Sequence, residues 1–295
     1  LPHEIWPHRG NIDDQQEVLD DFIRTLPPLA NWSKRSDAYA LLIGASRYKK
    51  MPGRHFADRD VMNLRQLLVS RSWFMDDAQH IRQRLDHEVT QSALQWDIDW
   101  LITQGRTNPN AMLLFYYSGH GLLHQVQSGR EVGREAMLLP IDADPEQLTA
   151  TTGYPLSRLK AELSKLPNKE IVVILDACFN QSSACATWRP TGGGGQQHGG
   201  GSPTLFGGKP PWLVAAVNSG ALPYPPGRQS GFSYFLMRGL LGEADGLADG
   251  KRDGWVDMAE AFQYARDRLT EKHLTMDPLM TAPARLRISK IGGER

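Results

Sequence analysis

Three short apolar runs constrain the fold of this 295-residue chain more than any other feature. They read YALLIG at 39–44, AMLLFYYS at 111–118 and EIVVILDA at 170–177. Continuous apolar runs of this length are typical of strands that are buried on both faces, as in a parallel sheet. In such open sheets, ligands and reactive groups gather at the carboxyl ends of the strands. We therefore expect a functional site where these runs end.

Stretches with helical spacing of apolar residues separate the runs. Apolar side chains recur every three or four residues in 58–71, 90–103 and 156–166, and 80–85 is a further candidate strand. Strands that alternate with amphipathic helices are typical of a parallel sheet with helices on both faces. The sequence therefore predicts an α/β fold.

The alternation resumes after a long interruption. We predict strands at 212–217 and 284–288, and helices at 231–241 and 256–270. Together with the four earlier strands, these complete a mostly parallel sheet of six strands.

The pattern divides the chain into an N-terminal extension and one larger domain. We expect the extension, 1–37, to contain one helix, and the domain to cover 38–290. Within the domain, a large part at 38–179 and a small part at 212–290 flank a linker at 180–211. The linker contains GGGGQQHGGG and can bury little apolar surface.

The charge balance and the cysteine content exclude several kinds of partner. The 33 basic and 33 acidic residues cancel, so no overall field attracts nucleic acid or an anionic membrane. No apolar stretch approaches the roughly 20 residues needed to cross a bilayer. Two cysteines form no disulfide framework, which favours a reducing, cytoplasmic location. We expect neither nucleic acid nor a membrane as a partner.

The third and fourth strands each end beside a residue suited to nucleophilic catalysis. His120 follows the third strand and Cys178 follows the fourth. Since the carboxyl ends of parallel strands share one edge, we expect the imidazole and the thiol to meet there. A histidine can activate a thiol as general base and then protonate a leaving amine. The alternatives are a buried core thiol and a turn histidine between Gly119 and Gly121.

Two further groups complete this candidate site. The backbone N–H groups of Gly121 and Cys178 are candidates for stabilising the oxyanion of an acyl-transfer intermediate. Asp176 lies two residues before Cys178, so strand alternation points both side chains the same way. A carboxylate at that point is explained if the substrate brings a Lys or Arg side chain. The alternative is an aspartate that accepts backbone N–H bonds where the strand turns.

The motifs that contain His120 and Cys178 are YYSGHG and ILDACF. They resemble the His and Cys motifs of the caspase and metacaspase clan of cysteine peptidases. The similarity also includes ALLIGASRYKKMPGRHFADRDVMNLRQLL, which resembles the first strand and first helix of the clan, and AMLLP, which resembles the strand after the histidine. The segment that begins GFSYFLMRGLL resembles the small part of bacterial caspase-like proteins of the metacaspase or orthocaspase type. The resemblance covers about 38–290 and implies a caspase-haemoglobinase fold.

The resemblance implies that His120 and Cys178 form a dyad that hydrolyses peptide bonds. It also implies that Asp176 belongs to the S1 pocket, which receives the P1 side chain of the substrate and selects Arg or Lys. Metacaspases usually carry a second pocket acid after the fifth strand, where this chain reads AAVNSGALPYPP and has none. The substrates implied are proteins or peptides that are cut after basic residues.

The expected chemistry needs no cofactor, and no Cys or His pair has the spacing of a zinc site. Many metacaspases bind calcium through an acidic loop, and the corresponding LLPIDADPEQ offers only Asp142, Asp144 and Glu146. A second calcium candidate, 249–260, matches an EF-hand loop in part but has Lys251 at a ligand position. The alternative there is a turn followed by an Asp-capped helix.

The basic residues that flank the linker suggest activation by cleavage. No Lys or Arg occurs from 190 to 208, whereas Arg189 and Lys209 flank this stretch. A protease that prefers basic P1 residues, or an upstream activating protease, would cut at these two positions. The alternative is an inert spacer.

Two functions are consistent with these features. The first is a cysteine endopeptidase, placed by resemblance in a bacterial immune or cell-death pathway and switched on by an upstream regulator. The second is a caspase-like scaffold that binds partner proteins without hydrolysis. The presence of both His120 and Cys178 favours the first.

Overall fold

The computed structural model of the chain describes residues 33–54, 56–128, 131–149, 151–177, 179, 212–216, 229–247, 250–274, 278–280 and 285–291. The helix predicted in the N-terminal extension and the linker at 180–211 lie outside these residues.

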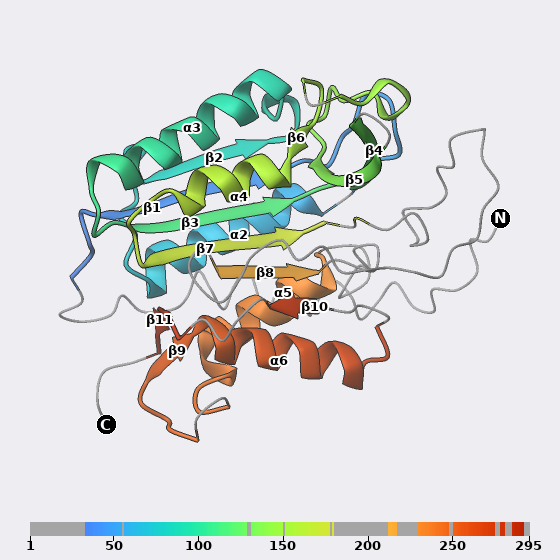
Figure 1. The fold of residues 1–295 in the computed structure, drawn as a ribbon. Helices are drawn as coiled ribbons and strands as arrows, with labels where there is room; N and C mark the ends of the chain where they lie inside the picture. The colour runs from blue at the N-terminus through green and yellow to red at the C-terminus, as the bar shows by residue number, and fades with distance from the viewer. Residues whose placement is uncertain are drawn as a thin grey trace.

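A six-stranded sheet forms the centre of the described structure, in the order β10-β8-β7-β3-β1-β2 (Figure 1). Its strands are β1 (Ala38–Gly44), β2 (Ile81–Leu85), β3 (Met112–Ser118), β7 (Glu170–Asp176), β8 (Trp212–Ala216) and β10 (Pro278–Met280). Neighbouring strands are parallel except for β10, which is antiparallel to β8. The predicted fold class, an α/β fold with a mostly parallel sheet, is confirmed.

Helices cover both faces of this sheet (Figure 1). They are α2 (Ala57–Arg71), α3 (Gln91–Thr107), α4 (Leu156–Ser164), α5 (Gly231–Arg238) and α6 (Met258–Glu271). Because successive strand residues point to opposite faces, Leu41 of β1 packs in the cluster with α3 and α4, and Leu42 in the cluster with α2, α5 and α6. The sheet is thus buried on both sides, as its continuous apolar runs predict.

Polar side chains fix where two of these helices begin. At α3, the Thr90 side chain accepts a hydrogen bond from the Ala93 N–H. At α6, Asp257 and Glu260 form a capping box, in which each side chain accepts a hydrogen bond from the other's backbone N–H. Both helices therefore start where the sequence offers a partner for N–H groups that the helix itself leaves unbonded.

Two smaller sheets and three short helical segments complete the described elements. β4 (Gly121–Ser128), β5 (Glu131–Leu138) and β6 (Tyr154–Pro155) form one sheet, and β9 (Trp255–Asp257) and β11 (Arg287–Lys290) form the other. The short segments are η1 (Asp86–Glu88), η2 (Pro145–Gln147) and η4 (Gly239–Glu243).

The prediction that 284–288 forms the sixth strand of the main sheet is wrong. Within the described part of this range, Arg287 and Ile288 belong to β11, which pairs with β9, and the edge of the main sheet is β10. β10 has only three residues and begins with Pro278. A run this short has no measurable periodicity, and proline is tolerated at the first residue of an edge strand, so the sequence pattern did not reveal it.

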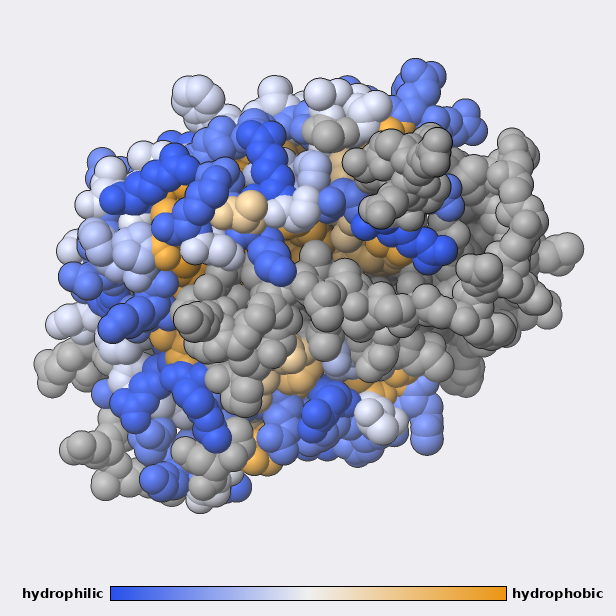
Figure 2. Space-filling model, viewed as in Figure 1, coloured by the Kyte–Doolittle hydropathy of each residue, from blue (hydrophilic) through white to orange (hydrophobic). Residues whose placement is uncertain are grey.

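The described surface is mostly hydrophilic on the face that Figure 2 shows. Among the described residues, the large apolar side chains with substantial exposure are Met62, Trp96 and Leu247. None of the described helices combines the length and the apolar character that crossing a bilayer would require.

Candidate active site

The strands that precede the two motifs end side by side. β3 and β7 are parallel neighbours, and Ser118 is the register partner of Asp176 at their carboxyl ends. The Gly119 N–H donates to the Asp176 carbonyl oxygen over 3.2 Å. His120 and Cys178 each follow this paired position by two residues in the chain. The predicted residues Cys178, Arg189 and Lys209 lie outside the described residues.

A backbone carbonyl orients the imidazole of His120. Its Nε2 atom lies 2.8 Å from the Pro52 carbonyl oxygen. Because a carbonyl oxygen only accepts, Nε2 carries the proton in the neutral ring and Nδ1 is the basic nitrogen. The ring packs against the Tyr48 ring, with 4.6 Å between the centroids. Since His120 is partly exposed, the ring is accessible from outside.

Two tyrosines hold the backbone around this histidine. The His120 N–H donates to the Tyr48 hydroxyl over 2.6 Å. The Tyr117 hydroxyl lies 2.8 Å from the His120 carbonyl oxygen and 2.8 Å from that of Leu139. A Cβ atom on Gly119 would lie 2.6 Å from the Tyr117 hydroxyl and 2.7 Å from that of Tyr48. Gly119 is therefore required by close packing of the two hydroxyl groups.

Gly121 begins β4 with its N–H directed away from β5. Its register partner is Leu138, and the Leu139 N–H donates to the His120 carbonyl oxygen just before this pair. In an antiparallel ladder, such a flanking bond marks a pair whose own backbone groups do not bond each other. The Gly121 N–H therefore points away from the partner strand and is not used in its ladder.

Asp176 is fully buried and is already bonded to two side chains. Its Oδ1 atom accepts from Arg54 Nη2 over 2.5 Å, and its Oδ2 atom from Ser233 Oγ over 2.5 Å. Arg54 is also buried, with 6% of its surface exposed, and it donates through Nη1 to the Gly119 carbonyl oxygen. In this structure the cation bonded to Asp176 is Arg54. The role of Asp176 toward a basic P1 side chain stays a prediction.

A second buried acid, Asp60 of α2, lies beside this pair. Its oxygens accept from Ser118 Oγ over 3.0 Å and from the Ser230 N–H over 3.1 Å. Burial, followed by repulsion from Asp176, raises the pKa of Asp60 well above its ordinary value. The cluster Arg54, Asp60, Ser118, Asp176 and Ser233 thus joins the loop before α2, α2 itself, the ends of β3 and β7, and α5.

The raised pKa of Asp60 predicts a pH-dependent contribution to stability. The folded chain holds this proton more tightly than the unfolded chain, so the contribution is present at low pH and is lost as pH rises through the folded pKa. Asp60→Asn keeps the side chain neutral at every pH. We expect it to match the wild type in acid and to exceed it increasingly at higher pH.

Urea unfolding of both proteins across the pH range measures this difference. Because the other titrating groups are common to both proteins, the difference between them reports on Asp60 and its interaction with Asp176. A stability difference that stays constant with pH would contradict the prediction.

Pro52, Arg54 and Asp60 are site residues that were not predicted from the sequence. A signal was present for Asp60, because it precedes Leu64 by four and Leu67 by seven residues on the buried stripe of α2. An acid on such a stripe needs a polar partner. The partners themselves are distant in sequence and could not be read from it.

Two of the three acidic residues considered for calcium in the loop LLPIDADPEQ, Asp142 and Asp144, have other hydrogen-bond partners. Asp142 accepts from the Gln91 N–H over 3.1 Å. Asp144 accepts from Lys50 Nζ over 2.7 Å and from the Glu146 N–H over 3.1 Å. These carboxylates stabilise the loop and the turn in which they lie.

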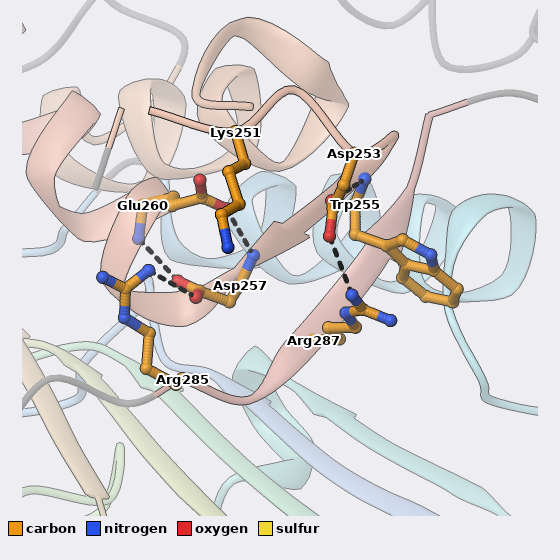
Figure 3. A pocket seen from close by; sticks show the side chains of 7 residues that line it. All are labelled: Lys251, Asp253, Trp255, Asp257, Glu260, Arg285 and Arg287. Carbon is orange, nitrogen blue, oxygen red and sulfur yellow. Dashed lines mark hydrogen bonds and ion pairs between the residues drawn. The ribbon is translucent and has the colours of Figure 1, made fainter. Parts of the chain in front are cut away.

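The second calcium candidate contributes to a cleft of paired charges, shown in Figure 3. Arg285 donates to Asp257 over 3.2 Å, and Arg287 to Asp253 over 2.7 Å. Asp257 and Glu260 cap α6, which is the alternative that the sequence left open. The cleft is lined by Lys251, Asp253, Trp255, Asp257, Glu260, Arg285 and Arg287. Within the described part of the chain, no group of three or more His, Cys, Asp or Glu side chains is placed to hold a metal ion.

The fold and the histidine motif at the carboxyl edge of the sheet define an α/β protein of the cysteine-peptidase-like class. Residues 37–272 match the Peptidase_C14 family model, described as the caspase domain, and the chain belongs to this family. Cysteine peptidases of this family need no cofactor.

A solved structure extends the similarity to the fold. It is the crystal structure of protein GSU0716 from Geobacter sulfurreducens, with a TM-score of 0.51 and 14% sequence identity. The match covers 87% of this chain and 98% of that chain. At this level of identity the similarity concerns the fold alone. No curated protein matches this chain.

Proposed function

We propose that the protein is a cysteine endopeptidase that uses Cys178 and His120. The observation that supports this most is the pairing of β3 with β7, in which Ser118 and Asp176 are register partners at the carboxyl ends of the strands. His120 and Cys178 each follow this pair by two residues in the chain. The hydrogen bond between His120 Nε2 and the Pro52 carbonyl oxygen also supports the proposal. It places the proton of the neutral ring on Nε2, so that Nδ1 is the nitrogen that can accept the thiol proton.

The proposed reaction proceeds by acyl transfer. His120 Nδ1 takes the thiol proton, and Cys178 Sγ attacks the carbonyl carbon of the scissile bond. The backbone N–H groups of Gly121 and Cys178 stabilise the oxyanion. As the C–N bond breaks, the proton passes from His120 to the leaving amine. Water then hydrolyses the thioester and restores the thiol.

A preference for Arg or Lys at P1 is part of the proposal. It is supported by the buried Asp176, whose side chain lies at the end of β7. Arg54 is the cation bonded to Asp176 in the substrate-free chain. A basic P1 side chain therefore has to bind beside Arg54 or displace it from Asp176.

Activation by cleavage at Arg189 or Lys209 is a further part of the proposal. These residues flank a stretch without Lys or Arg, so a protease that selects basic residues would cut only at its ends. Mass spectrometry of the purified protein should show new termini at these positions after activation. The cytoplasm and a bacterial immune or cell-death pathway are proposed as the setting, with an upstream regulator and protein substrates as partners.

Cleavage of a peptide panel tests the proposed function. Peptides with Arg, Lys, Asp or Ala at P1 are incubated with the wild type and with Cys178→Ala. We expect the wild type to cut the Arg and Lys peptides and the variant to cut none. Equal inactivity of both proteins under every activating condition would favour the non-catalytic scaffold, and a preference for Asp would overturn the assignment of Asp176.

Tyr48→Phe tests how the histidine is positioned. The change removes the hydroxyl that accepts from the His120 N–H but keeps the ring that packs on the imidazole. We expect kcat to fall by roughly tenfold with KM unchanged, because a lost hydrogen bond of about 1.5 kcal/mol displaces His120 without touching substrate. Steady-state kinetics on the best peptide measure both constants. A change in KM alone would contradict this role.

A further inference from the structure

Arg54 has an unusual position for a charged residue. Residues 45–54, between β1 and α2, form no helix or strand, yet the Arg54 side chain is 5% exposed and lies against the sheet edge. Its backbone N–H donates to the Ser46 carbonyl oxygen over 2.7 Å. The guanidinium reaches inward from this loop to two residues next to the catalytic motifs, Gly119 and Asp176.

Arg54 contacts Asp176, the carboxylate that the proposed function assigns to the P1 side chain of the substrate. The proposed function gives Asp176 to a P1 arginine or lysine, and a P1 arginine would present the same guanidinium group. Asp176 offers two oxygens, of which Oδ1 bonds Arg54 and Oδ2 bonds Ser233. A bidentate bond to a P1 guanidinium needs both oxygens of the carboxylate. Arg54 and a basic P1 side chain therefore compete for Asp176.

We propose that Arg54 is a specificity-determining residue that stands in for a basic P1 side chain and must leave Asp176 before an Arg or Lys of the substrate can bind. The inference rests on the proposed function and adds to it an internal competitor. Arg54 lies on an irregular loop, so its side chain can withdraw without unwinding a helix or separating strands. The wild-type preference for basic P1 residues is then weaker than it would be if Asp176 had no bond to Arg54.

Substrate binding without hydrolysis gives the first test. A peptide with Arg at P1 is titrated by calorimetry into Cys178→Ala and into Cys178→Ala/Arg54→Ala. We expect the second protein to bind at least about tenfold more tightly, because the peptide guanidinium no longer has to displace a competitor. A peptide with Ala at P1 should bind both proteins equally.

Hydrolysis gives the second test, through a ratio that a merely structural role would not change. We expect Arg54→Ala to raise the ratio of kcat/KM for the Arg peptide to that for the Ala peptide by about tenfold. Arg54→Lys keeps a cation on Asp176 and should leave the ratio near the wild-type value. Arg47→Ala is the matched control, since Arg47 lies in the same loop with its side chain 84% exposed and its guanidinium toward Asp86.

Folding of Arg54→Ala is checked with ethylguanidinium, which restores the atoms that the substitution removes. We expect this probe to raise the midpoint of thermal unfolding of Arg54→Ala and to leave Arg47→Ala unchanged. If Arg54→Ala does not fold without the probe, Arg54→Met replaces it in both tests.

The outcomes separate this inference from the proposed function. Loss of hydrolysis of all peptides in Arg54→Ala, with no gain in affinity for the Arg peptide, would overturn the inference and leave the peptidase proposal standing. A wild-type preference for Asp that disappears in Arg54→Ala would also overturn it, since Arg54 would then bind the substrate itself. A gain in affinity without hydrolysis by any catalytically intact protein would support the inference and count against the peptidase.

Discussion

His120→Ala should lower kcat/KM for the best peptide by roughly 10²- to 10⁴-fold, the contribution typical of a general acid–base group. The expected loss is large because one ring acts twice, first on the thiol of Cys178 and then on the leaving amine. The hydrogen bond between Nε2 and the Pro52 carbonyl oxygen makes Nδ1 the nitrogen that accepts and then donates the proton. Steady-state kinetics, together with the rate of alkylation of Cys178 by iodoacetamide, measure the two effects separately. Both rates should fall, since the thiolate is the nucleophile in each reaction.

His124→Ala is the matched control for this experiment. His124 lies four residues further along the chain, in β4, and is also partly exposed. Its register partner is Glu135 of β5, on the hairpin rather than at the main sheet edge. We expect kinetics close to those of the wild type. Retention of full activity by His120→Ala, or an equal loss in His124→Ala, would contradict the assignment of the general base.

The parts of the fold that could be predicted are those in which burial imposes a pattern. β1, β3 and β7 have apolar residues on both faces because helices cover both sides of the sheet, and a continuous apolar run reveals that directly. β10 escaped prediction because its three residues pair with β8 through a contact that local sequence does not encode. The sixth strand was therefore placed in β11, which has the stronger local pattern but a different partner.

The candidate site shows the same division between local and distant information. His120 and Asp176 could be identified because each follows an apolar strand in the chain. Arg54 and Asp60 could not be assigned, since their roles depend on contacts with residues 58 to 170 positions away in sequence. The order of strands brings these contacts together, because β1, β3 and β7 are adjacent in the sheet. A charged residue becomes interpretable only when the group that neutralises it is known.

The ion pair between Arg54 and Asp176 should be strongly coupled in stability. Asp176→Asn leaves the buried guanidinium without its hydrogen-bonded counter-charge, and Arg54→Met leaves the buried Asp176 without its own. We expect each single substitution to lower the free energy of unfolding by about 3–5 kcal/mol at neutral pH. The double variant buries no unpaired charge from this pair, so it should lose much less than the sum of the single losses. Urea unfolding of the four proteins completes the cycle.

The result of this cycle shows whether the charges are the cause. Penalties that add in the double variant would mean that packing around Ser233 and Gly119 matters more than the charges. Strong coupling would mean instead that Asp176 depends on a cation, which is the condition under which Arg54 and a basic substrate exchange places.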